Sequence, residues 1–392
     1  GTVDLQGTRT LTLEMSNSGN MQLQVLGLEL SGEAFRIDVE APFTIEPGEK
    51  QPINVTFIPL AAGEDNGALQ ITSDAPGRLG MAEVGLTGAG GALALRPLTE
   101  LAVGTGPADM LMVDLDQDGA MDLAIADSAR GQLRLFLNDG TGQYLDPVIY
   151  PGAASVYGDW DEPVALAAGA IYGKGPDLIV GDPVARTISI LQNDGTGFFD
   201  LNREDIFIGH QVADVLTADL DADGDVDIAV ANRDAASITV LFNNGEGSFS
   251  ARITRDVEAG PRALLATHLD PDEHADLVVA NSTSGTISVL FGNRNGGFET
   301  RQDFVVGTDP AALVGVDYDA DGDNDVLVGN GGSRDVVILQ NDGAGGLALS
   351  ERISVGVPVV DLAMSDLTAD IFSDLVVGSS TGSHLSFLEN EG

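Results

Sequence analysis

Residues 114–122 read Asp-Leu-Asp-Gln-Asp-Gly-Ala-Met-Asp and run directly into the apolar segment Leu-Ala-Ile-Ala at residues 123–126. The pattern Asp-x-Asp-x-Asp-Gly-x-x-Asp returns at residues 219–227 and 317–325, each time before a short β-branched segment. Two carboxylates about 4 Å apart repel by about 4 kcal/mol at an effective dielectric of about 20. A hard divalent cation that prefers oxygen ligands removes this repulsion. Each loop therefore predicts a structural Ca²⁺ site that leads into a strand.

The loops share only their beginning with a helix-loop-helix calcium site. Acidic residues at positions 1, 3 and 5 and a glycine at position 6 resemble the start of an EF-hand. An EF-hand has a bidentate glutamate at position 12, whereas these loops have Ile125, Val230 and Val328 inside strand-like segments. We therefore expect the aspartate at position 9 to close the site, with the carbonyl at position 7 as a further ligand. The predicted ligands are Asp114, Asp116, Asp118, Ala120 and Asp122; Asp219, Asp221, Asp223, Asp225 and Asp227; and Asp317, Asp319, Asp321, Asp323 and Asp325.

Three further copies of the loop are degenerate. One copy keeps only Asp177, and we expect no cation there. The other two keep several acidic residues but lack the glycine at position 6. Their candidate ligands, for weaker sites, are Asp270, Asp272 and Asp276 in one copy and Asp366, Asp370 and Asp374 in the other. The sequence thus predicts three full Ca²⁺ sites, or five with the weaker ones.

The ninth-position aspartate marks a repeat along most of the chain. It occurs at Asp122, Asp177, Asp227, Asp276, Asp325 and Asp374, with spacings of 55, 50, 49, 49 and 49 residues. Each unit reads as a strand, the acidic loop, a second strand, a polar turn, a third strand such as Ser237–Phe242, an Asn/Asp-Gly hairpin and a fourth strand. Four strands in about 50 residues are typical of a propeller blade. We therefore predict an all-β fold with a six-bladed propeller.

The sixth unit ends after its third strand, at Gly392. Residues 91–104 read almost like the fourth strand of the fifth unit. We expect them to pair with the C-terminal strands and close the ring, because closure hides sheet edges. Seven blades are the alternative, if a further repeat has been trimmed from the C-terminus.

These motifs resemble the FG-GAP/VCBS repeats of β-propellers related to the head of integrin α subunits. The resemblance covers about residues 91–392, within a predicted domain 89–392. It rests on the aspartate loops, on strands such as Asp276–Asn281 and on the Asn-x-Gly-x-Gly-x-Phe motif at residues 243–249. The resemblance implies a calcium-stabilised extracellular recognition platform. It also implies metal loops on one face and ligand-binding loops on the opposite face.

Residues 1–88 lack the repeat and form a separate predicted domain. Alternating segments such as residues 10–13, 21–26, 53–57 and 68–72 are separated by Gly, Asn, Pro and Asp turns, which is typical of an antiparallel sandwich. The order of these segments resembles the immunoglobulin-like modules called choice-of-anchor D or ASH. Such modules are spacers and assembly units, so the resemblance implies self-assembly through this domain. A generic sandwich is the alternative.

Composition limits the function. The chain has 61 acidic and 18 basic residues and a formal charge of −43, which disfavours binding to nucleic acid. No apolar run approaches the length of a membrane span, and the lack of cysteine is compatible with a bacterial surface protein. The four histidines are scattered and form no catalytic or zinc motif, so we expect no enzyme. With the calcium loops, these features predict an extracellular or cell-surface location.

Two groups of residues are candidates for ligand binding. The long connection at residues 146–162 contains the only tryptophan and two tyrosines, which are common anchors for proteins and sugars. Its candidates are Tyr150, Tyr157 and Trp160, with padding of the gap beside the second blade as the alternative. The second group recurs in the turns between the second and third strands and can receive a carboxylate or sulfate. It consists of Arg130, Arg186, Arg233 and Arg334, with pairing to Asp127, Asp182, Asp234 and Asp335 in the same turns as the alternative.

The sequence therefore predicts a protein for adhesion, ligand recognition or surface assembly, with a surface protein or a glycan as its partner. The recognition surface is expected on the propeller face opposite the calcium loops. The alternative is a carbohydrate-binding module of a larger secreted enzyme. A structural repeat within a surface fibre is a third class, for which no soluble ligand is expected.

Overall fold

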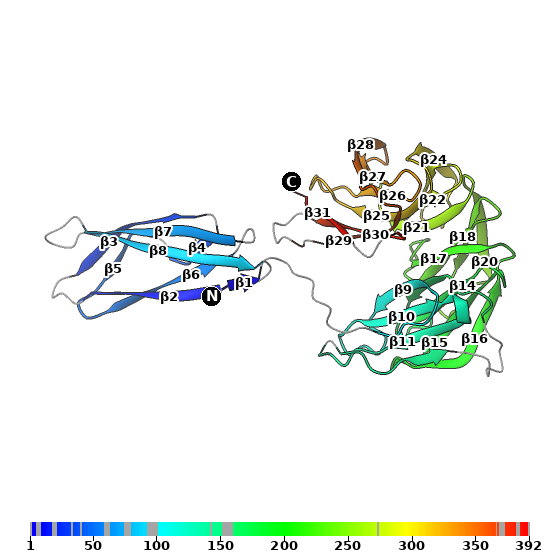
Figure 1. Cartoon of the computed structure of the whole chain (residues 1–392), viewed down its shortest axis with the longest axis horizontal. Helices are drawn as coiled ribbons and strands as arrows, with labels where there is room; N and C mark the ends of the chain where they lie inside the picture. The colour runs from blue at the N-terminus through cyan, green and yellow to red at the C-terminus, as the bar shows by residue number, and fades with distance from the viewer. Residues whose placement is uncertain are drawn as a thin grey trace. The chain divides into compact units, whose positions relative to one another are not determined.

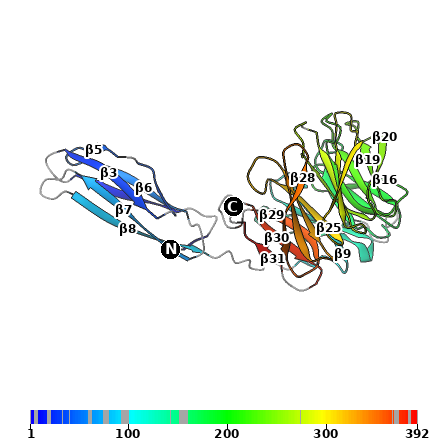
Figure 2. The ribbon, with the colours of Figure 1, turned by 90° about the horizontal axis from the view of Figure 1, so that it is seen from above.

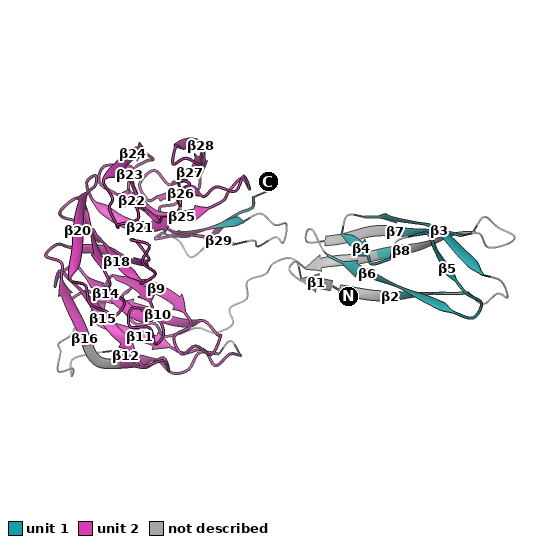
Figure 3. Cartoon of the chain, turned by 180° about the vertical axis from the view of Figure 1, so that it is seen from behind, with its two compact units in different colours: residues 1–97, 365–375, 388–392 teal, residues 98–364, 376–387 magenta. Residues whose placement is uncertain are grey.

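Two compact all-β units make up the chain. The computed structural model describes residues 2–4, 9–17, 22–32, 34–39, 41–58, 63–73, 80–91, 101–141, 143–150, 160–272, 274–365, 367, 373–381 and 385–390. One unit comprises residues 1–97, 365–375 and 388–392, and the other comprises residues 98–364 and 376–387 (Figure 3). The only helical element in these described ranges is the 3₁₀ turn η1 (Ser128–Arg130). None of the described helical structure has the length and apolar composition for a bilayer crossing.

Strands β1 to β8 form a sandwich of two sheets. The sheets have the strand orders β1-β8-β7-β3-β5 and β2-β6-β4. The strands are β1 (Thr2–Asp4), β2 (Arg9–Ser16), β3 (Leu23–Ser31), β4 (Phe35–Ile37), β5 (Phe43–Ile45), β6 (Lys50–Phe57), β7 (Gly63–Ser73) and β8 (Gly80–Gly91). Side chains from both sheets, such as Phe35, Phe57 and Leu69, share one buried core, and the long strands run alongside one another (Figure 2). The predicted boundary at residue 88 lies within β8.

The rest of the chain forms six consecutive sheets, which we number 1 to 6. Sheets 1 to 5 each have four antiparallel strands in chain order. Sheet 1 has β9 (Pro107–Val113), β10 (Asp122–Asp127), β11 (Gln132–Phe136) and β12 (Val148–Tyr150); sheet 2 has β13 (Ala165–Gly169), β14 (Asp177–Asp182), β15 (Thr187–Asn193) and β16 (Phe199–Phe207); sheet 3 has β17 (Val212–Ala218), β18 (Asp227–Asn232), β19 (Ser237–Phe242) and β20 (Ala251–Asp256). Sheet 4 has β21 (Pro261–Thr267), β22 (Asp276–Asn281), β23 (Thr286–Phe291) and β24 (Thr300–Val305); sheet 5 has β25 (Pro310–Val316), β26 (Asp325–Asn330), β27 (Asp335–Asn341) and β28 (Leu347–Ser354); sheet 6 has β29 (Val359–Ser365), β30 (Asp374–Ser379) and β31 (Ser386–Leu388).

The second strand of each sheet is the most buried. In sheets 1 to 5 every residue of β10, β14, β18, β22 and β26 is buried, as expected for short apolar runs covered on both faces. Four apolar cores join sheet 1 to 2, 2 to 3, 3 to 4 and 4 to 5. The innermost strands β9, β13, β17, β21 and β25 are neighbours in that order, and the sheets follow one another along an arc (Figure 1). This repeated radial order is propeller-like.

The predicted closure is not seen in the described residues. Sheet 6 has three strands and no fourth partner there. Most of the predicted closing strand, residues 92–100, lies outside the described ranges, and residues 101–106 form no strand. The number of blades and the closure of the ring therefore stay predictions.

A buried aspartate connects the parts of every sheet. The ninth-position aspartates of all six repeats are at most 2% exposed. One carboxylate oxygen accepts an N–H from the preceding loop, and the other accepts an N–H from the hairpin after the third strand. The donor pairs are Leu115 and Asn138 for Asp122, Tyr172 and Asn193 for Asp177, Leu220 and Asn243 for Asp227, Leu269 and Gly292 for Asp276, Tyr318 and Asn341 for Asp325, and Leu367 and Asn390 for Asp374, at 2.7–3.0 Å. We call this arrangement the aspartate tether.

The hairpin of one sheet contacts the loop of the preceding sheet. The side-chain amide of Asn193 donates to the carbonyl of Leu115 in sheet 1 at 2.8 Å. Asn341 of sheet 5 donates in the same way to Leu269 of sheet 4 at 2.9 Å. A Cβ atom added at Gly296 would lie 2.9 Å from the Cβ of Asp221, so only glycine fits at this contact. The acidic loops of sheets 1 and 3 are thus packed against the next sheet.

The tether of sheet 2 can be tested without any metal, because Asp177 is the only acidic residue left in its loop. We expect Asp177→Ala to lower the free energy of unfolding by about 2–5 kcal/mol, since each buried N–H left without an acceptor costs about 1–3 kcal/mol. Urea unfolding followed by fluorescence of Trp160, which packs in the core between sheets 1 and 2, measures the change. The exposed Asp256→Ala is the matched control. An equal loss in both variants would contradict the tether.

Candidate metal loops and central cavity

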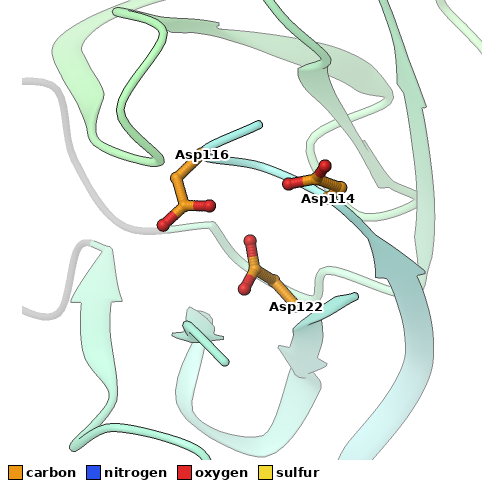
Figure 4. A group of neighbouring side chains, drawn as sticks. All are labelled: Asp114, Asp116 and Asp122. Carbon is orange, nitrogen blue, oxygen red and sulfur yellow. The ribbon is translucent and has the colours of Figure 1, made fainter. Parts of the chain in front are cut away.

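Three acidic loops each bring three carboxylates together. One oxygen from each of the aspartates at positions 1, 3 and 9 lies within 4.8 Å of the others. The three groups are Asp114, Asp116 and Asp122; Asp219, Asp221 and Asp227; and Asp317, Asp319 and Asp325. In the first group the three side chains face a common space (Figure 4). An all-oxygen donor set with three negative charges fits a hard cation such as Ca²⁺.

The aspartate at position 5 lies outside these groups. The carboxylate of Asp118 accepts the N–H of Ala120 at 2.7 Å, and Asp223 and Asp321 accept the N–H two residues later in the same way. These bonds shape the turn, as aspartate side chains commonly do. The structure thus brings three of the four predicted carboxylates of each loop together, and Asp118, Asp223 and Asp321 stay predicted ligands. The carbonyls of Ala120, Asp225 and Asp323 stay predicted ligands.

Backbone conformation explains the glycine at position 6. Gly119 has a φ of 91°, and the residue at position 4, Gln117, has a φ of 60°. The other two loops repeat both values closely. The left-handed turn points two N–H groups at the first aspartate: Asp114 accepts from Asp118 at 3.1 Å and from Gly119 at 3.0 Å. These N–H groups offset part of the negative charge in the loop.

Burial perturbs the ninth-position aspartates of the loops. The pKa of Asp227 is raised to about 7, mainly by desolvation and to a smaller extent by the charges of Asp221 and Asp223, while two backbone hydrogen bonds oppose the increase. Burial also raises the pKa of Asp122 and Asp325. Carboxylates held in this way are stabilised in their charged form by a nearby cation. The raised pKa values of these aspartates therefore favour a bound cation, as the all-oxygen donor set does.

The degenerate loops keep the aspartate tether, but their described residues form no cluster of three carboxylates. In sheet 4 the carboxylate of Asp270 accepts the N–H of Asp272, and Asp272 accepts that of His274. Burial raises the pKa of Asp276 there as well. The candidates Asp366 and Asp370 lie outside the described residues, whereas Asp374 forms the tether of sheet 6. The weaker sites stay predictions.

A central cavity of about 1160 Å³ lies among the inner strands of sheets 1, 3, 4, 5 and 6. Its walls come from the first halves of these strands, from Glu162 and Val164 just before the inner strand of sheet 2, and from the turns after the second strands of sheets 2 and 3. Because strands alternate in direction, those turns lie at the end of the sheets opposite the acidic loops. The charged lining residues are Asp109, Glu162, Asp214, Asp361, Arg186, Arg233 and Arg262.

The four predicted arginines do not form one ring. Arg186 and Arg233 line the cavity, but Arg130 and Arg334 are not among its lining residues. The predicted same-turn pairs are also not seen among the described residues. Asp127 pairs with Arg134, Asp335 with Arg352, and Asp234 with Arg186 of the neighbouring sheet at 3.8 Å, whereas Asp182 accepts backbone N–H groups.

The predicted aromatic site is mostly core. Tyr150 and Trp160 are 7% and 3% exposed and pack between sheets 1 and 2. The indole N–H of Trp160 donates to Ser189 at 3.0 Å, and the guanidinium of Arg203 lies 4.8 Å from the ring centre. Both side chains therefore fill the space beside the second blade, which was the alternative to ligand binding. Tyr157 lies outside the described residues.

Sequence reasoning missed the cavity acids and Arg262. Asp109, Asp214 and Asp361 each lie 13 residues before a ninth-position aspartate, so the repeat alignment contains the signal. Arg262 lies where the register of β21 shifts against β22, a β-bulge between Pro261 and Ala263. Bulges turn side chains out of the regular alternation. No sequence pattern in the chain marks this bulge.

Comparisons with known protein families agree with the repeats and the N-terminal domain that the sequence predicts. Residues 268–328 match the model of the FG-GAP-like repeat, and residues 1–80 match the ASH model (Abnormal spindle-like microcephaly-associated, ASPM-SPD-2-Hydin). A search of curated proteins finds no match.

Similar solved structures show the fold. A protein from Lactobacillus plantarum is 15% identical with a TM-score of 0.52, over 82% of this chain and 91% of that chain. The periplasmic gluconolactonase PpgL of Pseudomonas aeruginosa is 15% identical with a TM-score of 0.50, over 84% of this chain and 97% of that chain. The chain therefore contains an ASH domain at residues 1–80 and an FG-GAP-like repeat at residues 268–328, within an array of propeller-like sheets.

Proposed function

We propose that the repeat sheets form a calcium-stabilised recognition module of an extracellular or cell-surface protein. The observation that carries the proposal is the separation of two features at opposite ends of the same sheets. Three carboxylate clusters lie at one end, and the central cavity with Arg186 and Arg233 lies at the other. Loops on a rigid scaffold commonly carry binding. The proposed activity is binding rather than catalysis.

Ca²⁺ in each loop would stabilise two sheets at once. The loop of sheet 1 contacts the hairpin of sheet 2 through Leu115 and Asn193, and the loop of sheet 3 contacts the hairpin of sheet 4 through Asp221 and Gly296. A cation held by Asp114, Asp116 and Asp122 fixes the loop on which the next hairpin rests. The metal would thus hold the sheets in place while the opposite end receives the partner.

Arg186 and Arg233 are the residues proposed to receive an acidic group of the partner. The nearest carboxylate to Arg186 is at 3.8 Å and partly exposed, which makes a weak ion pair. No carboxylate lies within 4.0 Å of Arg233 among the described residues. Arg186 also donates to the carbonyl of Gly209 at 3.2 Å, which uses only part of its donor set. The remaining N–H groups of a guanidinium can bind a carboxylate or sulfate.

Calcium removal tests the metal role. At a Ca²⁺ concentration of 100 times Kd, each site adds about 2.7 kcal/mol to the free energy of unfolding. We expect a higher melting temperature with Ca²⁺ than with chelator in differential scanning calorimetry. The double variant Asp219→Asn/Asp221→Asn should lose part of this difference, whereas Asp256→Asn should keep all of it. Identical melting curves with and without Ca²⁺ would refute the role.

Glycan and surface-protein arrays, read with Ca²⁺ and with chelator, test recognition. We expect partners that bind the full chain in Ca²⁺ to bind Arg186→Glu/Arg233→Glu more than about tenfold more weakly, because the new carboxylates repel an acidic group. Arg334→Glu, which does not line the cavity, is the matched control. Unchanged binding by the double variant would remove the two arginines from the site, and binding to glycans alone would favour a carbohydrate-binding module.

A further inference from the structure

Three aspartates on different inner strands line the central cavity at one register position. Asp109 of β9 pairs with Ala126 of β10, and Asp214 of β17 pairs with Ala231 of β18. Asp361 of β29 has the same place in the sixth repeat, because it also lies 13 residues before the ninth-position aspartate, Asp374. The corresponding residues of sheets 4 and 5 are alanines, Ala263 and Ala312, which also line the cavity. The acids therefore line a space in which the equivalent positions of sheets 4 and 5 carry small apolar side chains.

The three carboxylates are held by backbone N–H groups. Asp109 accepts from Met110 and, across to the next sheet, from Leu166, both at 2.7 Å. Asp214 accepts from Val215 at 2.9 Å and from Leu264 of the next sheet at 2.7 Å. Asp361 accepts from Leu362 at 2.9 Å. These bonds fix the carboxylates before any ligand arrives.

The protein supplies no paired cation to these acids. Among the described residues, no Lys, Arg or His nitrogen lies within 4.0 Å of any of the three carboxylates. Arg262 pairs with Asp309 at 3.0 Å, and Arg186 pairs with Asp234. The remaining charged lining residues are Arg233 and Glu162.

Desolvation acts on all three acids, and the charge of a neighbouring acid acts on Asp109 and Asp214 as well. The pKa of Asp214 is raised to about 7, mainly by desolvation and to a smaller extent by the charge of Asp109. Desolvation also raises the pKa of Asp109, with a further increase from Asp361, and it raises the pKa of Asp361 itself. A bound positive charge would reverse these shifts.

We propose that the central cavity binds an alkylammonium group on Asp109, Asp214 and Asp361, supplied by a small amine or by a lysine side chain of a partner protein. The apolar lining of Met110 and Leu264 suits the methylene groups of such a ligand but offers nothing to a hydrated metal ion. The arginines at the turn end favour a neutral or anionic tail over a second ammonium group. The inference rests on the proposed recognition role of this end of the sheets.

Isothermal titration of the full chain with 6-aminohexanoate, in calcium-containing buffer at about pH 8, tests the proposal. We expect wild type to bind it, and Asp214→Asn and Asp361→Asn to bind more than about tenfold more weakly, because each removes a negative charge that lines the cavity. Binding should also weaken towards about pH 6, where Asp214 becomes protonated. Asp256→Asn is the matched control, and N-acetylated 6-aminohexanoate, which has no ammonium group, should not bind.

Thermal melts show whether each variant folds. If Asp214→Asn does not fold, the binding measured for Asp361→Asn decides the test. A capped peptide with one lysine, compared with its acetyl-lysine form, separates the two sources: tighter binding than 6-aminohexanoate indicates a partner's lysine, and weaker binding a small amine. No binding of either ammonium ligand to wild type, or equal binding by Asp361→Asn, overturns the proposal. If array binding still depends on Arg186 and Arg233 in that case, the proposed recognition role remains supported.

Discussion

One interaction recurs in every sheet of the repeat array: a buried carboxylate that accepts two backbone N–H groups from separate segments. At Asp122 these donors are Leu115 of the preceding loop and Asn138 of the following hairpin. A single side chain thereby fixes the loop, the start of the second strand and the hairpin together. Asp177 does the same in a loop that has lost its other acids, so the tether does not require a metal cluster. The acidic clusters are additions to this common framework.

The strands were predictable because their signals are local. The predicted third strand Ser237–Phe242 and second strand Asp276–Asn281 coincide with β19 and β22. The direction of a side chain was not predictable from spacing. Asp118 belongs to the same motif as Asp114, yet its carboxylate lies outside the cluster of three, and Trp160 comes from a long connection but packs in a core. Which arginine meets which carboxylate also depends on the neighbouring sheet, as Arg186 and Asp234 show.

The two ends of the sheets differ in how their charges are arranged. At the loop end, carboxylates from one segment lie within 4.8 Å of one another and suit one small cation. In the cavity, carboxylates come from separate sheets and are spread around a space of about 1160 Å³. The first arrangement favours tight coordination and local stiffness. The second favours a larger, partly apolar ligand whose charge is shared among several sheets.

The amide of Asn193 and the carbonyl of Leu115 lie on adjacent repeats, and Asn341 and Leu269 repeat the arrangement three joints further on. The repeat of sheet 2 carries both halves of the joint, because Asn193 donates to the sheet before it and the carbonyl of Ile171 accepts from Asn243 of the sheet after it. A duplicated gene segment of one repeat length would bring both halves of the joint with it. Arrays of this kind can lengthen or shorten by whole repeats during evolution without inventing a new contact surface.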